Sequence, residues 1–178
     1  MATRQQKAML EKGNHAVGNL NNIKIKTVNH GALVIDADVD NFTWVELGFN
    51  ADGERTAKQL SNKATKGYLI ASPELRNMEE SLVDFYNAVG ERARIVVPEQ
   101  DYTRFDTSAY TLNTGVTEIK EGQVAHFDVA TKKFIISNPT AAHTDYAGSY
   151  NQFLVVNSED DLEYVAGKAT VRLEVSKA

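Results

Sequence analysis

The sequence contains no cysteine, and only 3 of its 178 residues are proline and 1 is tryptophan. Without cysteine the chain can form neither disulfide bonds nor thiolate metal sites, and it lacks a thiol nucleophile. No apolar run approaches the roughly 20 residues that a membrane-spanning helix needs. The first residues also lack the apolar core of a signal peptide. We therefore expect a soluble protein that is made in a cytoplasm and has no membrane partner.

A strong positive charge is missing as well. The chain has 19 basic and 24 acidic residues and a formal net charge of −5. Nucleic-acid-binding proteins more often carry a basic face and a high isoelectric point. We therefore expect no nucleic-acid partner.

The length and composition indicate one domain with a terminal extension. An apolar fraction of 42% is ordinary for a globular protein. Residues 1–20 are polar and offer few side chains that could anchor them to a core, so we interpret them as an N-terminal arm. Residues 21–178 are then a single domain, with a β-hairpin module near 115–178. We find no internal repeat in the sequence.

Most of the remaining sequence has the pattern of β-strands. Apolar and polar residues alternate, or short apolar runs rich in β-branched and aromatic residues occur between turn signals. The clearest hairpin is 121–136, where two apolar runs flank a polar turn. The polar stretch 54–66 is interpreted as a loop or a short helix. Further strands are expected at 23–27, 33–39, 42–47, 68–71, 94–97, 153–156 and 170–175.

One segment has the pattern of an amphipathic helix, about 73–89. Ser72 can cap its first N–H groups, Pro73 suits the first helical position, and Gly90 can end it. Apolar residues follow at helical spacing, and they are Leu75, Met78, Leu82, Phe85, Tyr86 and Val89. The predicted fold class is α+β, mainly β: antiparallel sheets or a small barrel, with this helix packed on a sheet and an extended N-terminal arm.

The sequence offers few residues for metal chemistry. The series Asp36, Asp38 and Asp40 fails as an EF-hand, because Asn41 and Leu47 occupy the positions that need Gly and Glu. A loose calcium site there remains an alternative to a solvated strand face.

No two of the four histidines have the i, i+4 spacing of a metalloprotease helix. A zinc site could then form only from histidines on strands that are distant in sequence, and this is the alternative to no zinc site. His126 lies on the strand face opposite Phe127, so we interpret it as a surface or interface residue.

Motifs for nucleophilic catalysis and nucleotide binding are absent. The sequence has no Gly-x-Ser-x-Gly turn and no Gly-rich phosphate loop. A pair of carboxylates that meet only in space would still permit glycosidase chemistry. We expect a protein without enzymatic activity, without a cofactor and without a metal site.

The hairpin supports a resemblance. Its order of Gly122, an apolar run, Asp128, a Thr131-Lys132 turn and a second apolar run resembles small β modules of tailed-phage head decoration proteins. The stretches 14–50 and 82–91 are similar to structural proteins encoded beside phage major capsid genes. The resemblance implies a virion structural protein that binds the major capsid protein on the outer capsid surface and stabilises the lattice. It also implies a homo-oligomer, with a trimer as one arrangement.

The resemblance further implies a mode of attachment. An N-terminal arm can add as a strand to an exposed sheet edge of the capsid protein. The partner-binding residues expected for this role are Ala16, Val17, Leu20, Ile23 and Ile25.

Two alternatives remain from the sequence. One is a neck, tail or connector component of the same particle. The other is a module that binds a host surface or carbohydrate through exposed aromatic side chains, for which the candidates are Trp44, Tyr102, Phe105 and Tyr110. Core packing is the competing role of each of these four.

Overall fold

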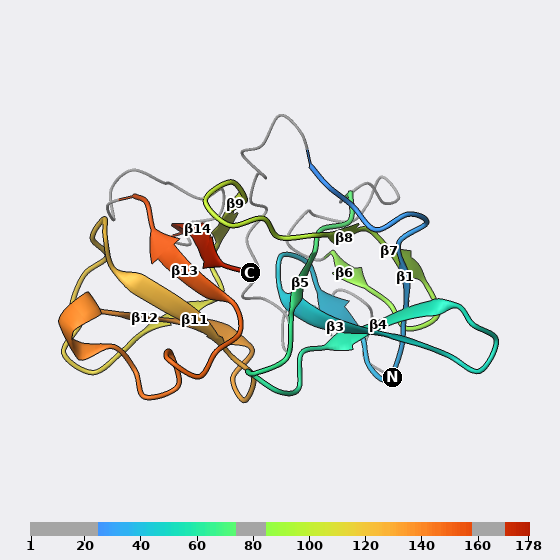
Figure 1. Cartoon of the computed structure of the whole chain (residues 1–178), viewed down its shortest axis with the longest axis horizontal. Coiled ribbons are helices and arrows are strands. Elements are labelled where there is room, and N and C mark those ends of the chain that lie inside the picture. Colours follow the sequence, from blue (N-terminus) through green and yellow to red (C-terminus); the bar gives the residue numbers. More distant parts are fainter. Residues whose placement is uncertain (1–24, 74–84, 158–169) are drawn as a thin grey trace.

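The computed structural model describes residues 25–73, 85–157 and 170–178. In these residues the chain is mainly β, and two six-stranded sheets lie side by side (Figure 1). The helical structure of the described part is one short 3-10 turn, η2, at Pro139–Ala141. The mainly β expectation is confirmed. The N-terminal arm lies outside the described residues.

The first sheet contains six short strands in the order β7-β1-β4-β3-β5-β8. Its outermost strands, β7 and β8, are separated in the chain by Arg94 alone. The sheet therefore curls until its two edges meet. The strands are β1 (Ala32–Val34), β3 (Trp44–Phe49), β4 (Arg55–Gln59), β5 (Tyr68–Ile70), β7 (Arg92–Ala93) and β8 (Ile95–Val96).

The second sheet has the order β10-β12-β11-β13-β14-β9. Its outermost strands β9 and β10 are joined by Ser108 and Ala109, and the Phe134 N–H donates to the Ala109 carbonyl at 2.8 Å. This sheet is therefore a nearly closed barrel, an arrangement that leaves little free edge. The strands are β9 (Arg104–Thr107), β10 (Tyr110–Leu112), β11 (Val124–Asp128), β12 (Lys133–Ser137), β13 (Gln152–Val155) and β14 (Val171–Lys177).

The hairpin predicted at 121–136 is confirmed as β11 and β12. Ala125 pairs with Ile136 and Phe127 with Phe134 in an antiparallel register. The turn is held by Asp128, whose carboxylate accepts hydrogen bonds from the Ala130 and Thr131 N–H groups. A side chain that satisfies turn N–H groups in this way fixes the register of the two strands.

The helix predicted at 73–89 is wrong in its last turn. Tyr86–Asn87 is strand β6, which pairs antiparallel with β2 (Val39–Asp40) in a separate two-stranded sheet. Val89, which the helical pattern placed on the buried face, is 50% exposed. The Asn87 side chain instead reaches the Val39 carbonyl. Residues 74–84 lie outside the described part of the chain.

Strand β4 shows a second difference from expectation. The polar stretch 54–66 contains β4, which lies in the middle of the first sheet between β1 and β3. Thr56 and Ala57 are its buried residues, and both are small. A strand whose buried positions hold such short side chains gives a weak hydrophobic signal in sequence.

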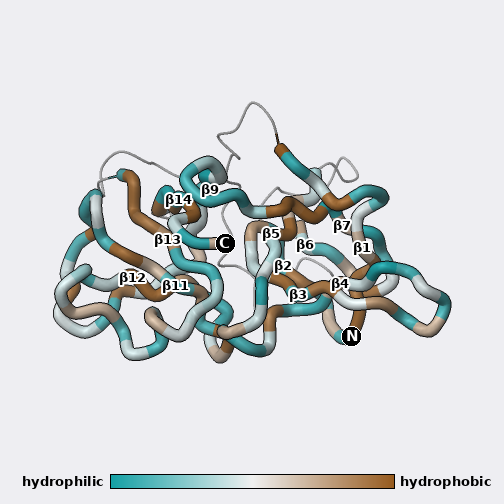
Figure 2. Tube along the Cα trace, viewed as in Figure 1, coloured by the Kyte–Doolittle hydropathy of each residue, from teal (hydrophilic) through white to brown (hydrophobic). Residues whose placement is uncertain are grey.

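Both sheets contribute to one core. Trp44 of the first sheet contacts Phe153 and Phe105 of the second, with ring centroids 5.0 Å and 6.3 Å apart. Phe134 packs against the same two phenylalanines. Apolar stretches follow the strands of both sheets, while the outer loops are polar (Figure 2). The two sheets are therefore held together by a shared aromatic cluster, which is enclosed by apolar side chains of both.

The two sheets also share one topology. In each, a strand pairs in parallel with the second strand of a hairpin, β1 with β4 and β10 with β12. The first hairpin strand then pairs with the strand that follows the hairpin, β3 with β5 and β11 with β13. An antiparallel strand comes next, β8 or β14. The fold therefore contains a structural repeat, although the sequence showed none.

Candidate metal centre

Three potential metal ligands meet on the outer face of the second sheet, over the middle of β11. His126 lies in β11, and His143 and Asp145 lie in the connection between β12 and β13. One ligand atom from each residue can be chosen so that all three lie within 4.8 Å of one another. The histidine rings stack with centroids 5.0 Å apart and an interplanar angle of 24°.

His126 is buried within the chain, which corrects the interpretation of it as a surface or interface residue. Its neighbours Ala125 and Phe127 face the core, and His126 faces the opposite side of β11. That side is covered by the connection at 138–151, so His126 is 1% exposed. Neither ring nitrogen has a hydrogen-bond partner in the structure.

The protonation of His126 follows from its surroundings. Burial and the neighbouring His143 lower the pKa of His126 from 6.5 to about 4. Burial has the larger effect, because a charged ring loses its hydration there. At neutral pH His126 is therefore an uncharged imidazole, the form in which histidine binds metals.

The other two potential ligands are held by the connection itself. The Asp145 N–H donates to Nδ1 of His143 at 3.2 Å, and the His143 N–H donates to Oγ of Ser137 at 3.2 Å. Lys63, from the connection between β4 and β5, forms an ion pair with Asp145 Oδ1. This ion pair lowers the pKa of Asp145, so the carboxylate is charged. The group thus offers two nitrogen donors and one anionic oxygen donor.

The cluster lies at the junction of the two sheets. The Tyr150 N–H donates to the Lys63 carbonyl at 2.8 Å. Nearby, the Gly67 N–H donates to Oδ1 of Asn151 at 2.7 Å. The connection that carries His143 and Asp145 therefore packs against the connection that carries Lys63.

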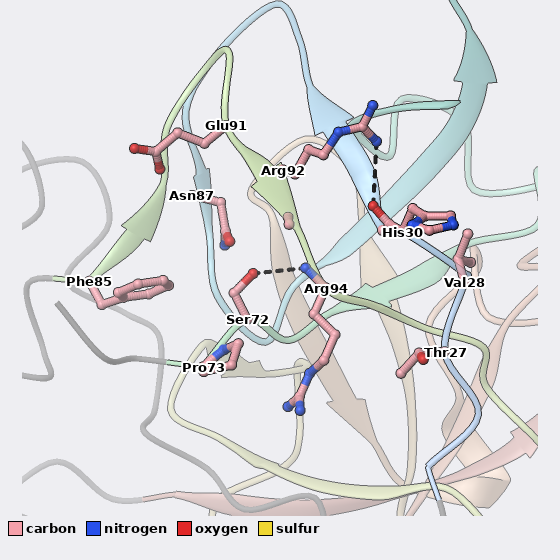
Figure 3. A pocket seen from close by; sticks show the side chains of 12 residues that line it. Thr27, Val28, His30, Ser72, Pro73, Phe85, Asn87, Glu91, Arg92 and Arg94 are labelled. Carbon is pink, nitrogen blue, oxygen red and sulfur yellow. Dashed lines mark hydrogen bonds between the residues drawn. The ribbon is translucent and has the colours of Figure 1, made fainter. Parts of the chain in front are cut away.

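A separate cavity of about 620 Å³ lies in the first sheet, near β7 (Figure 3). Its cationic groups are already engaged: Arg92 pairs with Glu54 and donates to the His30 carbonyl, and Arg94 Nε donates to the Ala71 carbonyl. The cavity is bordered by Pro73 and Phe85, which adjoin residues outside the described part. We assign it no chemistry.

Comparison with known proteins shows the family of this chain. A sequence model of the YonC prophage protein family matches residues 11–176. The chain belongs to this family. A curated relative, the SPbeta prophage-derived uncharacterized protein YonC of Bacillus subtilis (strain 168), is 64% identical over 178 residues, which are 100% of both chains. No solved structure matches the chain.

Family membership confirms the phage origin that the resemblance implied, at the level of a prophage protein. The family name states a prophage origin and says nothing of a role in the virion. A search of the described residues finds no helix long and apolar enough to cross a membrane.

The structure places few of the predicted site residues. Ala16, Val17, Leu20 and Ile23 lie outside the described residues. Ile25 is partly buried and packs against the chain's own core.

The acidic series Asp36, Asp38 and Asp40, kept as an alternative calcium site, is not a group with ligand spacing among the described residues. The Asp38 carboxylate accepts a hydrogen bond from the Val89 N–H at 3.0 Å. Asp36 lies at a bend with a φ of 69°, and Asp40 belongs to β2. Among the described residues, the group with suitable ligand spacing is the one at His126.

Two of the four aromatic candidates for ligand binding lie in the core. Trp44 and Phe105 are fully buried. Tyr110 is partly buried against the same core, and Tyr102 is 43% exposed. A shallow aromatic face built from all four is therefore ruled out.

The histidine cluster escaped sequence reasoning because its members are 17 and 19 positions apart, without a motif that links them. One feature of the sequence could have indicated the cluster, namely a histidine within an otherwise apolar stretch of a predicted strand. His126 stands between Ala125 and Phe127 in the hairpin, and a loop long enough to cover it follows β12.

Proposed function

We propose that this prophage-family protein is a non-enzymatic structural component of the phage particle, which binds the major capsid protein on the outer lattice and stabilises it. The observation that carries the proposal is an exposed aromatic side chain at the end of a strand in the first sheet. Phe49, the last residue of β3, is 66% exposed, and the Arg55 guanidinium lies 4.6 Å from the centre of its ring. The β3–β4 hairpin that carries both projects from the body of the protein (Figure 1).

The hairpin presents this pair in a fixed geometry. The Asn50 side chain accepts hydrogen bonds from the Asp52 and Glu54 N–H groups, and Gly53 adopts a φ of 77°. Aromatic and arginine side chains are enriched among the residues that dominate protein interfaces. A preformed turn reduces the entropy that binding would cost.

Lattice binding would add to this contact through repetition. An oligomer that touches several capsid subunits gains avidity without a strong single contact. Of the N-terminal residues 16–25, Ile25 packs on the chain's own core, so residues 16–23 are proposed as the second contact, by strand addition to a capsid sheet edge.

Sedimentation with undecorated phage heads tests the proposal. The full-length protein should pellet with heads at micromolar concentration. Phe49→Ala should weaken binding by about 30-fold, which corresponds to about 2 kcal/mol at a dominant interface residue. Tyr102→Ala removes an exposed aromatic residue elsewhere and is the matched control. Deletion of residues 1–20 should reduce head binding more than it reduces the stability of the fold.

Protein that stays in the supernatant would contradict the proposal, as would a Phe49→Ala variant that binds as well as the control. Copy number separates lattice binding from the neck or connector alternative. A lattice protein should reach hundreds of copies per particle, whereas a closed ring needs about a dozen.

A further inference from the structure

We propose that His126, His143 and Asp145 bind one divalent transition-metal ion, with zinc as the best match. The ion would fasten the connection between β12 and β13 onto β11. This site is independent of the proposed capsid contact at Phe49, which lies on the other sheet.

The donor set selects the class of metal. Two imidazole nitrogens and one carboxylate oxygen suit zinc and other late transition metals. Calcium and magnesium prefer shells composed of oxygen ligands. Three protein ligands leave a fourth position for water, as in open zinc sites.

The state of His126 is the independent observation that points to a ligand. A core histidine that serves packing alone normally has its nitrogens hydrogen-bonded, because an unpaired buried polar atom is costly. His126 is 1% exposed, and both of its ring nitrogens lack a partner. An ion bound between this ring and the two loop residues would satisfy one of them.

The distances require a modest closure of the loop. Zinc–ligand bonds of about 2.0–2.1 Å place tetrahedral ligand atoms roughly 3.4 Å apart, whereas the three atoms here lie within 4.8 Å. His143 and Asp145 belong to the partly exposed connection, so an inward movement of up to about 1.4 Å on their side closes the distances. The His143 ring must also turn out of its stack with His126, because a metal lies in the plane of each imidazole that binds it. His143 accepts the Asp145 N–H at Nδ1. A metal therefore binds His143 either at Nδ1 in place of that N–H, or at Nε2 after the ring turns over.

The Lys63 ammonium would compete with a metal ion for the Asp145 carboxylate. Its ammonium pairs with Asp145 Oδ1 and comes from the first sheet. A metal at the site must weaken this ion pair or share the carboxylate with it. Removal of the Lys63 charge should therefore strengthen metal binding, whereas loss of a ligand should weaken it.

Zinc titration of the full-length, chelator-treated protein tests the inference. Isothermal titration calorimetry should show one site with a dissociation constant in the micromolar range or below. His143→Gln and Asp145→Asn should each weaken binding at least tenfold, and Lys63→Met should strengthen it several-fold. The double variant His15→Gln/His30→Gln removes the two other histidines and should bind as the wild type does.

A second readout remains informative if a loop variant folds poorly. The wild-type protein loaded with cobalt should give the visible absorption of a four-coordinate site, and zinc-edge X-ray absorption should count two imidazole ligands. The inference is overturned if no saturable one-to-one binding occurs at 100 µM zinc, or if the His15→Gln/His30→Gln control loses as much affinity as His143→Gln. Absorption typical of an all-oxygen shell would overturn it as well.

Discussion

Replacement of His126 by leucine should stabilise the metal-free protein and abolish metal binding. In the structure this ring is 1% exposed and neither of its nitrogens has a hydrogen-bond partner. A buried polar atom without a partner costs about 1–3 kcal/mol. Leucine removes both nitrogens and leaves an apolar side chain in the same place.

The magnitude follows from two opposing effects. Relief of the unpaired nitrogens favours the variant, whereas imperfect packing of a differently shaped side chain costs about 1 kcal/mol. At about 1–3 kcal/mol for each of the two nitrogens, less about 1 kcal/mol for packing, we expect the free energy of unfolding to rise by about 1–5 kcal/mol in the presence of a chelator. For a chain of this length that corresponds to a rise in melting temperature of about 2–20 °C.

Zinc should narrow or reverse this difference in stability between the wild type and His126→Leu. At a free zinc concentration 100 times the dissociation constant, binding to the folded state adds about 2.7 kcal/mol to the stability of the wild type. His126→Leu should gain nothing. The assay is urea denaturation followed by tryptophan fluorescence, with EDTA and with buffered zinc, because Trp44 is the single tryptophan and lies in the core.

Phe127→Leu is the control for the substitution itself. Phe127 lies on the same strand and faces the core, so leucine there should destabilise the protein by about 1 kcal/mol or more. If His126→Leu is less stable than the wild type by a similar amount in EDTA, the ring nitrogens are hydrogen-bonded in solution and the reasoning fails. An equal zinc-dependent gain in wild type and His126→Leu would also refute it.

Two further predictions concern the scaffold. Gly31→Ala should destabilise the protein by about 1–3 kcal/mol more than Gly53→Ala in urea denaturation. Both glycines have positive φ, but a Cβ at Gly31 would lie 2.2 Å from the Ala93 carbonyl oxygen, whereas a Cβ at Gly53 meets nothing within 4 Å. Equal urea midpoints for the two variants would contradict the prediction. Burial raises the pKa of Glu46, but hydrogen bonds from the Ser61 N–H and hydroxyl, together with the Lys58 ammonium, outweigh burial and lower it below its ordinary 4.5. The ionised Glu46 therefore stabilises the fold above the unfolded-state pKa, and this stabilisation is lost as the pH falls through the folded-state pKa. Glu46→Gln should lower the urea midpoint at pH 7 but not at pH 3. An equal loss at both pH values would contradict the assignment.

The sequence predicted the parts of the fold in which local pattern and tertiary structure agree. The hairpin of β11 and β12 has alternating apolar residues and a turn that its own Asp128 stabilises. Strands β13 and β14 likewise combine short apolar or alternating runs with buried inner rows. In these segments the apolar residues that predict a strand are also the residues whose side chains are buried in the core.

The prediction failed where tertiary contacts decide the structure. Phe85 and Tyr86 fit a helical stripe, yet both are buried next to one another, and Tyr86 belongs to a strand. Helical spacing over a few apolar residues does not exclude other ways of burying them. His126 was misplaced for a related reason. Alternation along a strand shows which side chains share a face, but it does not show whether a loop covers that face.

The repeated topology explains why the candidate metal centre lies at the junction of the two sheets. The connection β4–β5, residues 60–67, and the connection β12–β13, residues 138–151, occupy corresponding places in the two halves. These two connections contact one another, through the Tyr150 N–H on the Lys63 carbonyl and through the ion pair of Lys63 with Asp145.

The corresponding strands form a common scaffold, and the longer connection carries two of the three proposed metal ligands. Loops on a common framework are where folds most readily acquire distinct functions. Residues 138–151 are long enough to cover the outer face of β11, and they contribute His143 and Asp145 opposite His126. The shorter connection 60–67 contributes Lys63, the cation that any bound metal must displace from Asp145 or share it with. The balance between that ammonium and a metal ion would therefore determine how firmly the two corresponding connections are held together.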